Sequence, residues 1–342
     1  MEGSDMKRSV ALIFAVGLLA TTPSAGAAQA NAPILDVMGE EIVATFSIVA
    51  RDPATGELGV AVQSRAFRAA AIVSYAKAGV GAIATQASAN QSYGPEGLAL
   101  LEQGRSPEEV VRQLTGADPG RDRRQLAVID ANGRVKAYTG SGTSDWAGHI
   151  EGENYSVQGN ILAGEAVVRS MARAFETTEG AFAERLMAAL DAGQAAGGDA
   201  RGKQSGGILI VKPIGDSGRT TDRWVDVRVD DHPTPFVEIR RLMNMSVSRN
   251  QSRTANDLAQ EGNLVEAIRA QRKAVALAPE SDRYLFGLAE LYARAGSTPS
   301  ALAMLTLAID RNPDWRARAT DSDAFAGIRG DADFRRIVGG GR

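Results

Sequence analysis

Apolar runs of strand length alternate with turn-forming residues in the first part of the chain. Residues 46–50, apart from Ser47, and 58–62 are apolar, and residues 52–56 between them read Asp-Pro-Ala-Thr-Gly. Proline presets one backbone dihedral, glycine supplies a positive one, and aspartate can bond back to the turn. The pattern therefore predicts a β-hairpin. Because hairpin strands run antiparallel, we expect Thr45 to lie near Ser64 and Arg65 at one end of a sheet.

The following segments extend this pattern into an α+β domain. Residues 66–74 and 79–85 are rich in small and apolar residues, which predicts buried strands. Ser106-Pro107-Glu108-Glu109 offers an N-cap, a proline in the first turn and early acidic residues, so a helix should follow. The other predicted elements are a hairpin over 125–139 around Asn132-Gly133, a strand over 155–158, strands over 205–212 and 224–229, and helices over 94–102, 165–176, 181–192 and 235–243.

The composition changes after Met245. Residues 246–254 are polar, with no apolar residue after Val247, and we assign 245–252 as a linker. A 34-residue spacing then relates four pairs: Gly262 and Gly296, Ala267 and Ala301, Ala274 and Ala308, Pro279 and Pro313. The spacing resembles that of tetratricopeptide repeats, over residues 253–314, whose grooves usually hold peptides or partner proteins. Two repeats are fewer than usually stand alone, so we expect them to pack on the preceding domain or on a second copy. Residues 315–342 should form a helical tail.

The N-terminus has the pattern of a secretory signal peptide. Lys7 and Arg8 precede an apolar run over 10–20, and small-x-small cleavage patterns occur at 25–27 and 28–30. We therefore assign 1–30 as the signal peptide and 31–44 as a lead segment, and expect export to a bacterial periplasm or beyond. The apolar run is too short to span a bilayer, so no membrane contact is expected after its removal. An uncleaved anchor is the alternative.

Composition excludes several classes of function. The net charge is −3 and no strongly basic stripe occurs, so nucleic acid is not an expected partner. The absence of cysteine excludes disulfides, thiolate metal sites and a cysteine nucleophile. With only two histidines, His149 and His232, a site with three histidine ligands is excluded. We expect no metal and no cofactor.

Nine ordered blocks within residues 45–244 resemble an uncharacterised family, domain of unknown function 1028, of the N-terminal-nucleophile (Ntn) hydrolase superfamily. They begin with Thr-Phe-Ser-Ile-Val-Ala-Arg-Asp and Gly-Glu-Leu-Gly-Val-Ala-Val-Gln-Ser. The blocks cover residues 45–52, 56–64, 78–86, 90–95, 117–121, 146–149, 157–162, 193–199 and 229–233. The resemblance implies a four-layer αββα sandwich over 45–244 and hydrolysis of amide bonds through an acyl-enzyme ester.

A threonine at the start of a mature chain can act without a separate base. Its free α-amine, with a pKa near ~8, takes the proton of its own hydroxyl. Thr45 is the expected nucleophile, and Arg65 is placed to lower the amine pKa and to stabilise an oxyanion. The alternative is a buried threonine at a strand start, in a fold that has lost activity. Ser47 is the second candidate hydroxyl, because alternation puts it on the same strand face.

This chemistry requires a second cut. Signal cleavage near Ala30 leaves residues 31–44 in front of Thr45, whose amine is then part of a peptide bond. The bond between Ala44 and Thr45 must therefore be cut, by the protein itself or by another protease.

Polar segments next to predicted strands are candidates for the oxyanion and substrate site. Residues 85–90 and 158–160 each combine amide or hydroxyl side chains with small residues that let backbone N–H groups approach a ligand. Ordinary loop capping is the alternative for both. The candidate residues are Ser64, Thr85, Gln86, Asn90, Gln158, Asn160, Asp199 and Ser205, the last two because related hydrolases use residues at this strand start.

Two further patterns give weaker hypotheses. Gly197, Gly202 and Lys203 match part of a phosphate-binding loop, but Gln204 stands where serine or threonine is required, so nucleotide binding is not favoured. Residues 226–232 include three aspartates and His232, which could hold a divalent ion but more often cap a helix such as the one near Pro235.

The leading hypothesis is an exported amidohydrolase that acts on a small amide or peptide-like compound. The alternative is a non-catalytic module that binds peptides or cell-wall fragments, with the helical repeats recruiting a partner protein. A homodimer is compatible with either.

Overall fold

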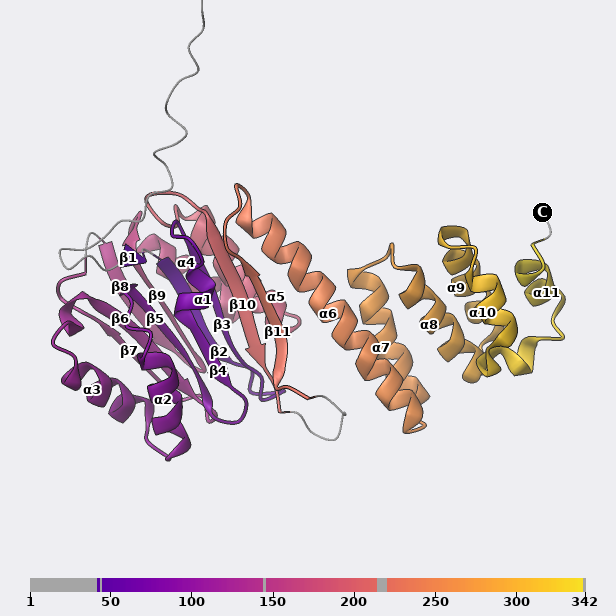
Figure 1. Ribbon diagram of the computed structural model, residues 1–342, viewed down its shortest axis with the longest axis horizontal. Coiled ribbons are helices and arrows are strands. Elements are labelled where there is room, and N and C mark those ends of the chain that lie inside the picture. The colour runs from indigo at the N-terminus through magenta and orange to yellow at the C-terminus, as the bar shows by residue number, and fades with distance from the viewer. Residues whose placement is uncertain (1–41, 44, 144–145, 214–219, 341–342) are drawn as a thin grey trace, which may run out of the picture. The chain divides into compact units, whose positions relative to one another are not determined.

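The structure is a computed structural model that describes residues 42–43, 45–143, 146–213 and 220–340. The expected signal peptide (1–30) and most of the lead segment lie outside the described residues. The described chain combines two antiparallel β-sheets with α-helices, followed by an all-helical region (Figure 1). Among the helices described, none has both the length and the apolar character needed to cross a membrane.

The elements have the following bounds. The strands are β1 (Ile42–Val43), β2 (Thr45–Arg51), β3 (Leu58–Ser64), β4 (Ser74–Lys77), β5 (Gly81–Ser88), β6 (Arg124–Asp130), β7 (Val135–Thr139), β8 (Trp146–Gly152), β9 (Tyr155–Leu162), β10 (Ser205–Val211) and β11 (Arg223–Val229). The α-helices are α1 (Ala69–Val73), α2 (Tyr93–Glu102), α3 (Pro107–Ala117), α4 (Ala166–Thr177), α5 (Phe182–Ala195), α6 (Pro235–Gln260), α7 (Leu264–Leu277), α8 (Asp282–Arg294), α9 (Thr298–Arg311), α10 (Trp315–Asp321) and α11 (Ala332–Val338), with 3-10 helices η1 (Arg121–Arg123) and η2 (Asp323–Ile328).

The hairpin predicted from the first apolar runs lies at the centre of one sheet. This six-stranded sheet has the order β11-β10-β3-β2-β9-β8, and the other has the order β1-β5-β6-β7 with β4 also paired to β5. The hairpin register runs from Thr45 opposite Ser64 to Arg51 opposite Leu58. At its turn, Asp52 Oδ1 accepts from the Ala54 N–H at 2.9 Å, and Gly56 has a φ of 71°. The predicted turn chemistry is confirmed.

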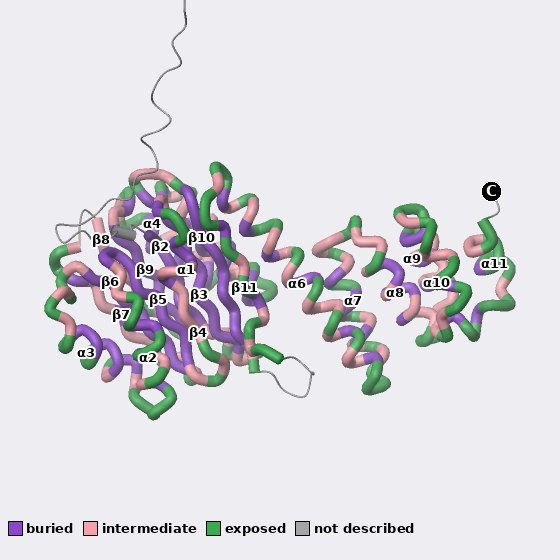
Figure 2. The backbone as a smooth tube through the Cα atoms, viewed as in Figure 1, coloured by how far each residue is buried: buried purple, intermediate pink, exposed green. Residues whose placement is uncertain are grey.

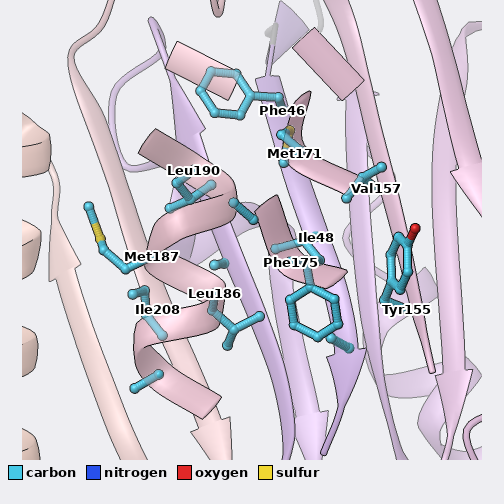
Figure 3. Packing of buried hydrophobic residues seen from close by; sticks show 14 of the residues in the cluster. Phe46, Ile48, Tyr155, Val157, Met171, Phe175, Leu186, Met187, Leu190 and Ile208 are labelled. Carbon is cyan, nitrogen blue, oxygen red and sulfur yellow. The ribbon is translucent and has the colours of Figure 1, made fainter. Parts of the chain in front are cut away.

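Strand alternation divides the apolar residues between two interfaces. Phe46 and Ile48 of β2 pack against α4 and α5 through Met171, Phe175 and Leu186 (Figure 3). Val49 lies on the opposite face of β2, and its cluster joins the six-stranded sheet to β5 and β6 of the second sheet. The other face of the second sheet packs on α2 and α3. Strands β3 and β5 are buried along their whole length, and β2 is buried up to its last residue, Arg51 (Figure 2).

Two segments differ from the sequence-based prediction in this domain. Residues 69–73, expected as part of a strand, form helix α1, because the run Ala69-Ala70-Ala71 has high helix propensity. Strand β8 was not predicted; it is an edge strand of mostly half-buried residues whose glycines and charged residues hide its alternation. The capping box predicted for α3 is present, with Ser106 and Glu109 bonding each other's backbone N–H.

The prediction of a linker over residues 245–252 is wrong. Helix α6 continues through it for 26 residues, since no glycine or proline interrupts the sequence between Phe236 and Gln260. Its first half contributes Ile239, Met243 and Val247 to the core of the sheet domain, and its second half contributes Ala255 and Ala259 to a separate helical cluster. Polar side chains in the middle of a helix do not end it when both ends are packed.

The 34-residue spacing corresponds to helix pairs. Ala267 and Ala301 are both fully buried, as are Ala274 and Ala308. Gly262 and Gly296 lie between the helices of each pair with φ of 81° and 76°. A left-handed backbone favours glycine, which accounts for the repeated glycine. Phe325, Ile328 and Phe334 of the tail are buried against α8 and α9, as its predicted capping role requires.

Candidate functional site

Four polar residues form a continuous row across one end of the six-stranded sheet. Ser205 pairs with Ser64, Ser64 with Thr45, and Thr45 with Asn160. Directly opposed residues of antiparallel strands share a face, and here it is the face toward the second sheet. None of the four is more than 1% exposed. The structure therefore brings candidate residues of three strands together around Thr45; of these, only Ser64 was placed there by the hairpin pattern.

A chain of amide and hydroxyl groups connects this row to the second sheet. We call it the glutamine network: Ser47, Gln86, Gln125, Ser156, Gln158 and Asn160. Gln158 Nε2 donates to Ser47 Oγ at 2.7 Å, and Ser47 Oγ donates to Gln86 Oε1 at 2.6 Å. Gln86 Nε2 then donates to Gln125 Oε1 at 2.7 Å and, at 3.4 Å, to the Thr45 carbonyl. Gln86 is thus fixed beside the backbone of Thr45.

Gln125 is the member that the sequence analysis missed. It lies near the start of β6, before the apolar residues 126–129, and is fully buried, with Nε2 also within hydrogen-bond distance of the Gly148 and Gly159 carbonyls. The sequence feature that could have identified Gln125 is a polar amide side chain within a predicted buried strand. Ser47, in turn, both donates and accepts within the network, so its contacts fit a structural role better than that of a free hydroxyl.

Asn160 presents a buried acceptor that has no partner. Its Nδ2 donates to Gln125 Oε1 at 3.2 Å, which fixes the orientation of the amide. Within the described part of the chain, no donor lies within hydrogen-bond distance of Asn160 Oδ1. A buried acceptor without a donor costs roughly 1–3 kcal/mol. The unpaired oxygen belongs to the residue directly opposite Thr45.

Asp199 and Ser205 hold the segment that follows β3. Asp199 Oδ2 accepts from the Arg65 N–H at 2.9 Å, and its carboxylate also forms an ion pair with Arg201 at 3.0 Å. Ser205 Oγ donates to the Ala66 carbonyl at 2.6 Å and accepts from the Ala69 N–H at 3.1 Å. The Arg65 guanidinium donates to Gln204 Oε1 at 2.6 Å. These contacts position Arg65 next to the row.

The predicted polar loop over residues 85–90 is divided by the structure. Thr85 to Ser88 belong to β5, where Gln86 pairs with Gln125 of β6. Because strand side chains alternate, Gln86 faces Thr45, whereas Thr85 shares the opposite face with Ile83, toward α2 and α3. Thr85 and Asn90 therefore do not join the glutamine network. Thr85 Oγ1 donates instead to the Asn90 carbonyl at 3.1 Å.

Asn90 belongs to a second cluster, which we call the aspartate clamp: Asn90, Tyr93, Asp118 and Arg124. Asp118 Oδ2 accepts from Tyr93 at 2.8 Å, from Arg124 Nε at 3.0 Å and from Asn90 Nδ2 at 3.4 Å. Burial raises the pKa of Asp118, but these hydrogen bonds and the Arg124 charge outweigh it and bring the pKa to about 2. Arg124 also donates to the Ser88 carbonyl at 2.6 Å, which fixes the end of β5.

The model of a family of unknown function, DUF1028, matches residues 45–239. The chain belongs to the DUF1028 family. A tetratricopeptide repeat model matches residues 258–320. No curated protein matches the chain significantly.

A crystal structure from the same family provides the structural comparison. Protein SPO2555 from Silicibacter pomeroyi is 33% identical, and the match covers 60% of this chain and 86% of that one with a TM-score of 0.55. In the chain described here, the match to the family model begins at Thr45, the first residue of β2.

His149 is connected to the glutamine network through Thr139. Gln125 Nε2 lies 2.9 Å from Thr139 Oγ1, and Thr139 Oγ1 shares a hydrogen bond of 2.8 Å with His149 Nδ1. Burial is the main cause that lowers the pKa of His149.

The aspartates near residue 230 are engaged by protein groups. Asp226 forms ion pairs with Arg223 and Arg228, and Asp231 Oδ1 accepts from Gln204 Nε2 at 3.1 Å. His232 Nδ1 accepts from the Thr234 N–H at 3.1 Å, immediately before α6. These contacts hold the segment before α6, but the N-cap residue Thr234 forms no side-chain capping hydrogen bond, so the interpretation of this segment as a helix cap is wrong.

A cavity of about 730 Å³ lies at the hairpin end of the sheet, opposite to Thr45. It is lined by Glu57, Phe182, Lys212 and Trp224, among others. Burial is the main cause that raises the pKa of Glu57, whose carboxylate lies 3.8 Å from Lys212 Nζ. Because β2 spans seven residues, or about 20 Å, this cavity is separate from the row around Thr45.

Proposed function

We propose that this DUF1028 protein is an exported amidohydrolase of the Ntn type, built on a four-layer αββα sandwich, that cleaves a small amide or peptide-like compound. The observation that supports this most is the position of Thr45. It is the first residue of a central strand and of the family match, and it lies in a buried row of hydroxyl and amide groups.

The proposed reaction uses Thr45 after the bond to Ala44 has been cut. The Thr45 hydroxyl attacks the substrate carbonyl while its α-amine takes the hydroxyl proton. The tetrahedral intermediate then expels the substrate amine, which receives that proton, and leaves an ester on Thr45. A water molecule, deprotonated by the same amine, hydrolyses the ester and restores the threonine.

Two neighbours would support this chemistry. Asn160 Oδ1, which has no hydrogen-bond partner among the residues that the structure describes, would accept a hydrogen bond from the new α-amine and orient its lone pair toward the hydroxyl. Arg65, fixed by Asp199 and Gln204, would lower the amine pKa through its charge and stabilise the oxyanion. Export rests on the signal-peptide pattern of residues 1–30.

The test combines N-terminal sequencing with substitution. We expect exported protein to begin at Thr45, and Thr45→Ala to lose hydrolysis of a panel of amides, whereas Thr45→Ser retains part of it. Ser92→Ala, at an exposed serine, is the matched control. Uncut chain together with unchanged turnover in Thr45→Ala would overturn the proposal, and selective loss in Ser47→Ala would transfer the nucleophile to Ser47.

A second candidate function is a non-catalytic binding module, and one feature of the repeats favours it. A hollow of about 520 Å³ is lined by Asn256 and Gln260 of α6, Glu290 and Arg294 of α8, and residues 322–324. A peptide or partner protein would occupy it. Absence of hydrolysis in every form of the protein, with partner binding lost in Asn256→Glu and Gln260→Glu, would favour this function. Size-exclusion chromatography would test the homodimer that is compatible with both.

A further inference from the structure

The segment in front of Thr45 is held in a different sheet from the strand that Thr45 begins. Ile42 pairs with Ser88 and Val43 with Ala87, antiparallel, so β1 extends the edge of β5. Thr45 itself pairs with Ser64 and Asn160 in the six-stranded sheet. The chain therefore passes from one sheet to the other at the bond that the proposed function requires to be cut.

That edge of β5 is short and firmly held. β4 pairs with the same strand over residues 81–84, and β6 occupies its opposite side, so β1 covers the end that remains, at Ala87 and Ser88. Both residues are less than 5% exposed, and Ala87 has a φ of 66°. Arg124 of the aspartate clamp fixes the Ser88 carbonyl. Removal of β1 takes away the strand pairing of this edge, which another strand can restore.

Resting on the proposed function, we infer that the acyl part of the substrate is a short extended peptide that pairs with Ala87 and Ser88 in place of β1. A substrate carbonyl that Thr45 attacks lies beside Thr45, and only one residue separates Thr45 from Val43 of β1. The groups on the acyl side of that carbonyl are then directed to the same edge. Only a chain with N–H and C=O groups at strand spacing restores the lost pairing, and the room left by β4 limits it to about two paired residues. The sequence before the cut, Ile-Val-Ala, is the natural probe.

Antiparallel pairing makes an asymmetric prediction. Consecutive residues of a strand direct their N–H and C=O groups to opposite sides, so only one of the two paired residues bonds to β5. Methylation of its nitrogen removes one hydrogen bond to β5, whereas methylation of the neighbouring nitrogen does not. The two methylated peptides are therefore matched controls for each other.

The experiment uses full-length protein that folds with its lead segment. Residues 41–44 are replaced by Ile-Glu-Gly-Arg, and factor Xa then cuts immediately before Thr45. The substrates are acetyl-Ile-Val-Ala-aminomethylcoumarin, acetyl-Ala-aminomethylcoumarin, and the tripeptide methylated at the nitrogen of Ile or of Val. We expect kcat/KM to fall at least about tenfold for the single-residue substrate and for one methylated peptide, and to stay within about threefold for the other.

Equal turnover of all four substrates, or equal loss in both methylated peptides, would overturn the inference while leaving the amidohydrolase intact. A separate measurement covers the case of no turnover. Fluorescence anisotropy of labelled Ile-Val-Ala acid on the cut protein tests pairing without chemistry, with the same two methylated forms. Asymmetric binding without hydrolysis would support the pairing and overturn the proposed function; symmetric or absent binding would overturn the pairing as well.

Discussion

Ser47 and Gln86 connect the two sheets through a single hydrogen bond of 2.6 Å between residues 39 positions apart. Ser47 Oγ also accepts a hydrogen bond from Gln158 Nε2, so one hydroxyl provides a hydrogen-bond partner for each of two buried amides. Among the described residues, the side chains of the glutamine network are hydrogen-bonded apart from Asn160 Oδ1, whereas the cluster around Val49 and Val60 further along is apolar.

Ser47→Ala should lower stability by about 3 kcal/mol, because it leaves both Gln86 Oε1 and Gln158 Nε2 without a partner in a buried site. Urea denaturation measures the change, and Ser92→Ala, at an exposed position, should stay within about 0.5 kcal/mol of the native protein. A loss in Ser47→Ala no larger than in the control would show that the network is not formed.

Asp118→Asn should make the free energy of unfolding depend less on pH in the acidic range. The folded pKa of Asp118, about 2, lies below the ordinary value of 3.8, so its carboxylate contributes stability that is present above about pH 4 and lost as the pH falls toward 2. At pH 7 we expect the variant to be less stable by roughly 1–3 kcal/mol. The difference from the native protein should shrink between pH 4 and 2; a constant difference over that range would contradict the assignment.

Asn160→Asp should move the activity profile to higher pH. A carboxylate beside the α-amine of Thr45 favours its charged form and raises the amine pKa, so the neutral amine that acts as base appears later in a titration. We expect the acidic limb of kcat/KM to shift upward by roughly one pH unit. Asn160→Leu lacks the charge and should lower kcat/KM without that shift. If the pH dependence of kcat/KM is identical in the native protein and both variants, the α-amine of Thr45 does not lie beside residue 160 and the prediction is wrong.

Gly262→Ala and Gly296→Ala should each destabilise the repeats by about 1 kcal/mol. Both glycines have positive φ, and an added Cβ meets nothing within 4 Å, so the cost is confined to the backbone. Gly327→Ala is the control, because its Cβ would also meet open space and its φ lies outside the left-handed region. Thermal melts followed by circular dichroism compare the three; equal melting temperatures would contradict the repeat assignment of these turns.

The sequence predicted local features well where turn chemistry or spacing was explicit. The hairpin around Gly56, the capping box at Ser106 and the repeated glycines are each dictated by residues a few positions apart. The pairing of Thr45 with Ser64 followed from the same hairpin.

What the sequence did not reveal depends on contacts between distant strands. Gln125 meets Gln86 and Asn160 only because β5, β6 and β9 are brought together by folding, so no local spacing marks it. In the sequence, Thr85 and Gln86 are equivalent members of one polar segment. In the structure, β5 continues to Ser88, so strand alternation places the two side chains on opposite faces. The continuity of α6 was hidden because polar residues 246–254 resemble a linker when their packing partners are unknown.

Helix α6 contributes residues to two hydrophobic cores, and this affects how the protein unfolds locally. Its first half packs with Ile239 and Val247 on the sheets, and its second half with Ala255 and Ala259 on the repeats. If α7 detaches, the residues around Ala255 lose their cover and the helix frays backward until packing at Val247 stops it. Amide exchange along α6 should therefore rise as a gradient toward Gln260, and a boundary for dividing the protein in two falls inside a helix and not in a loop.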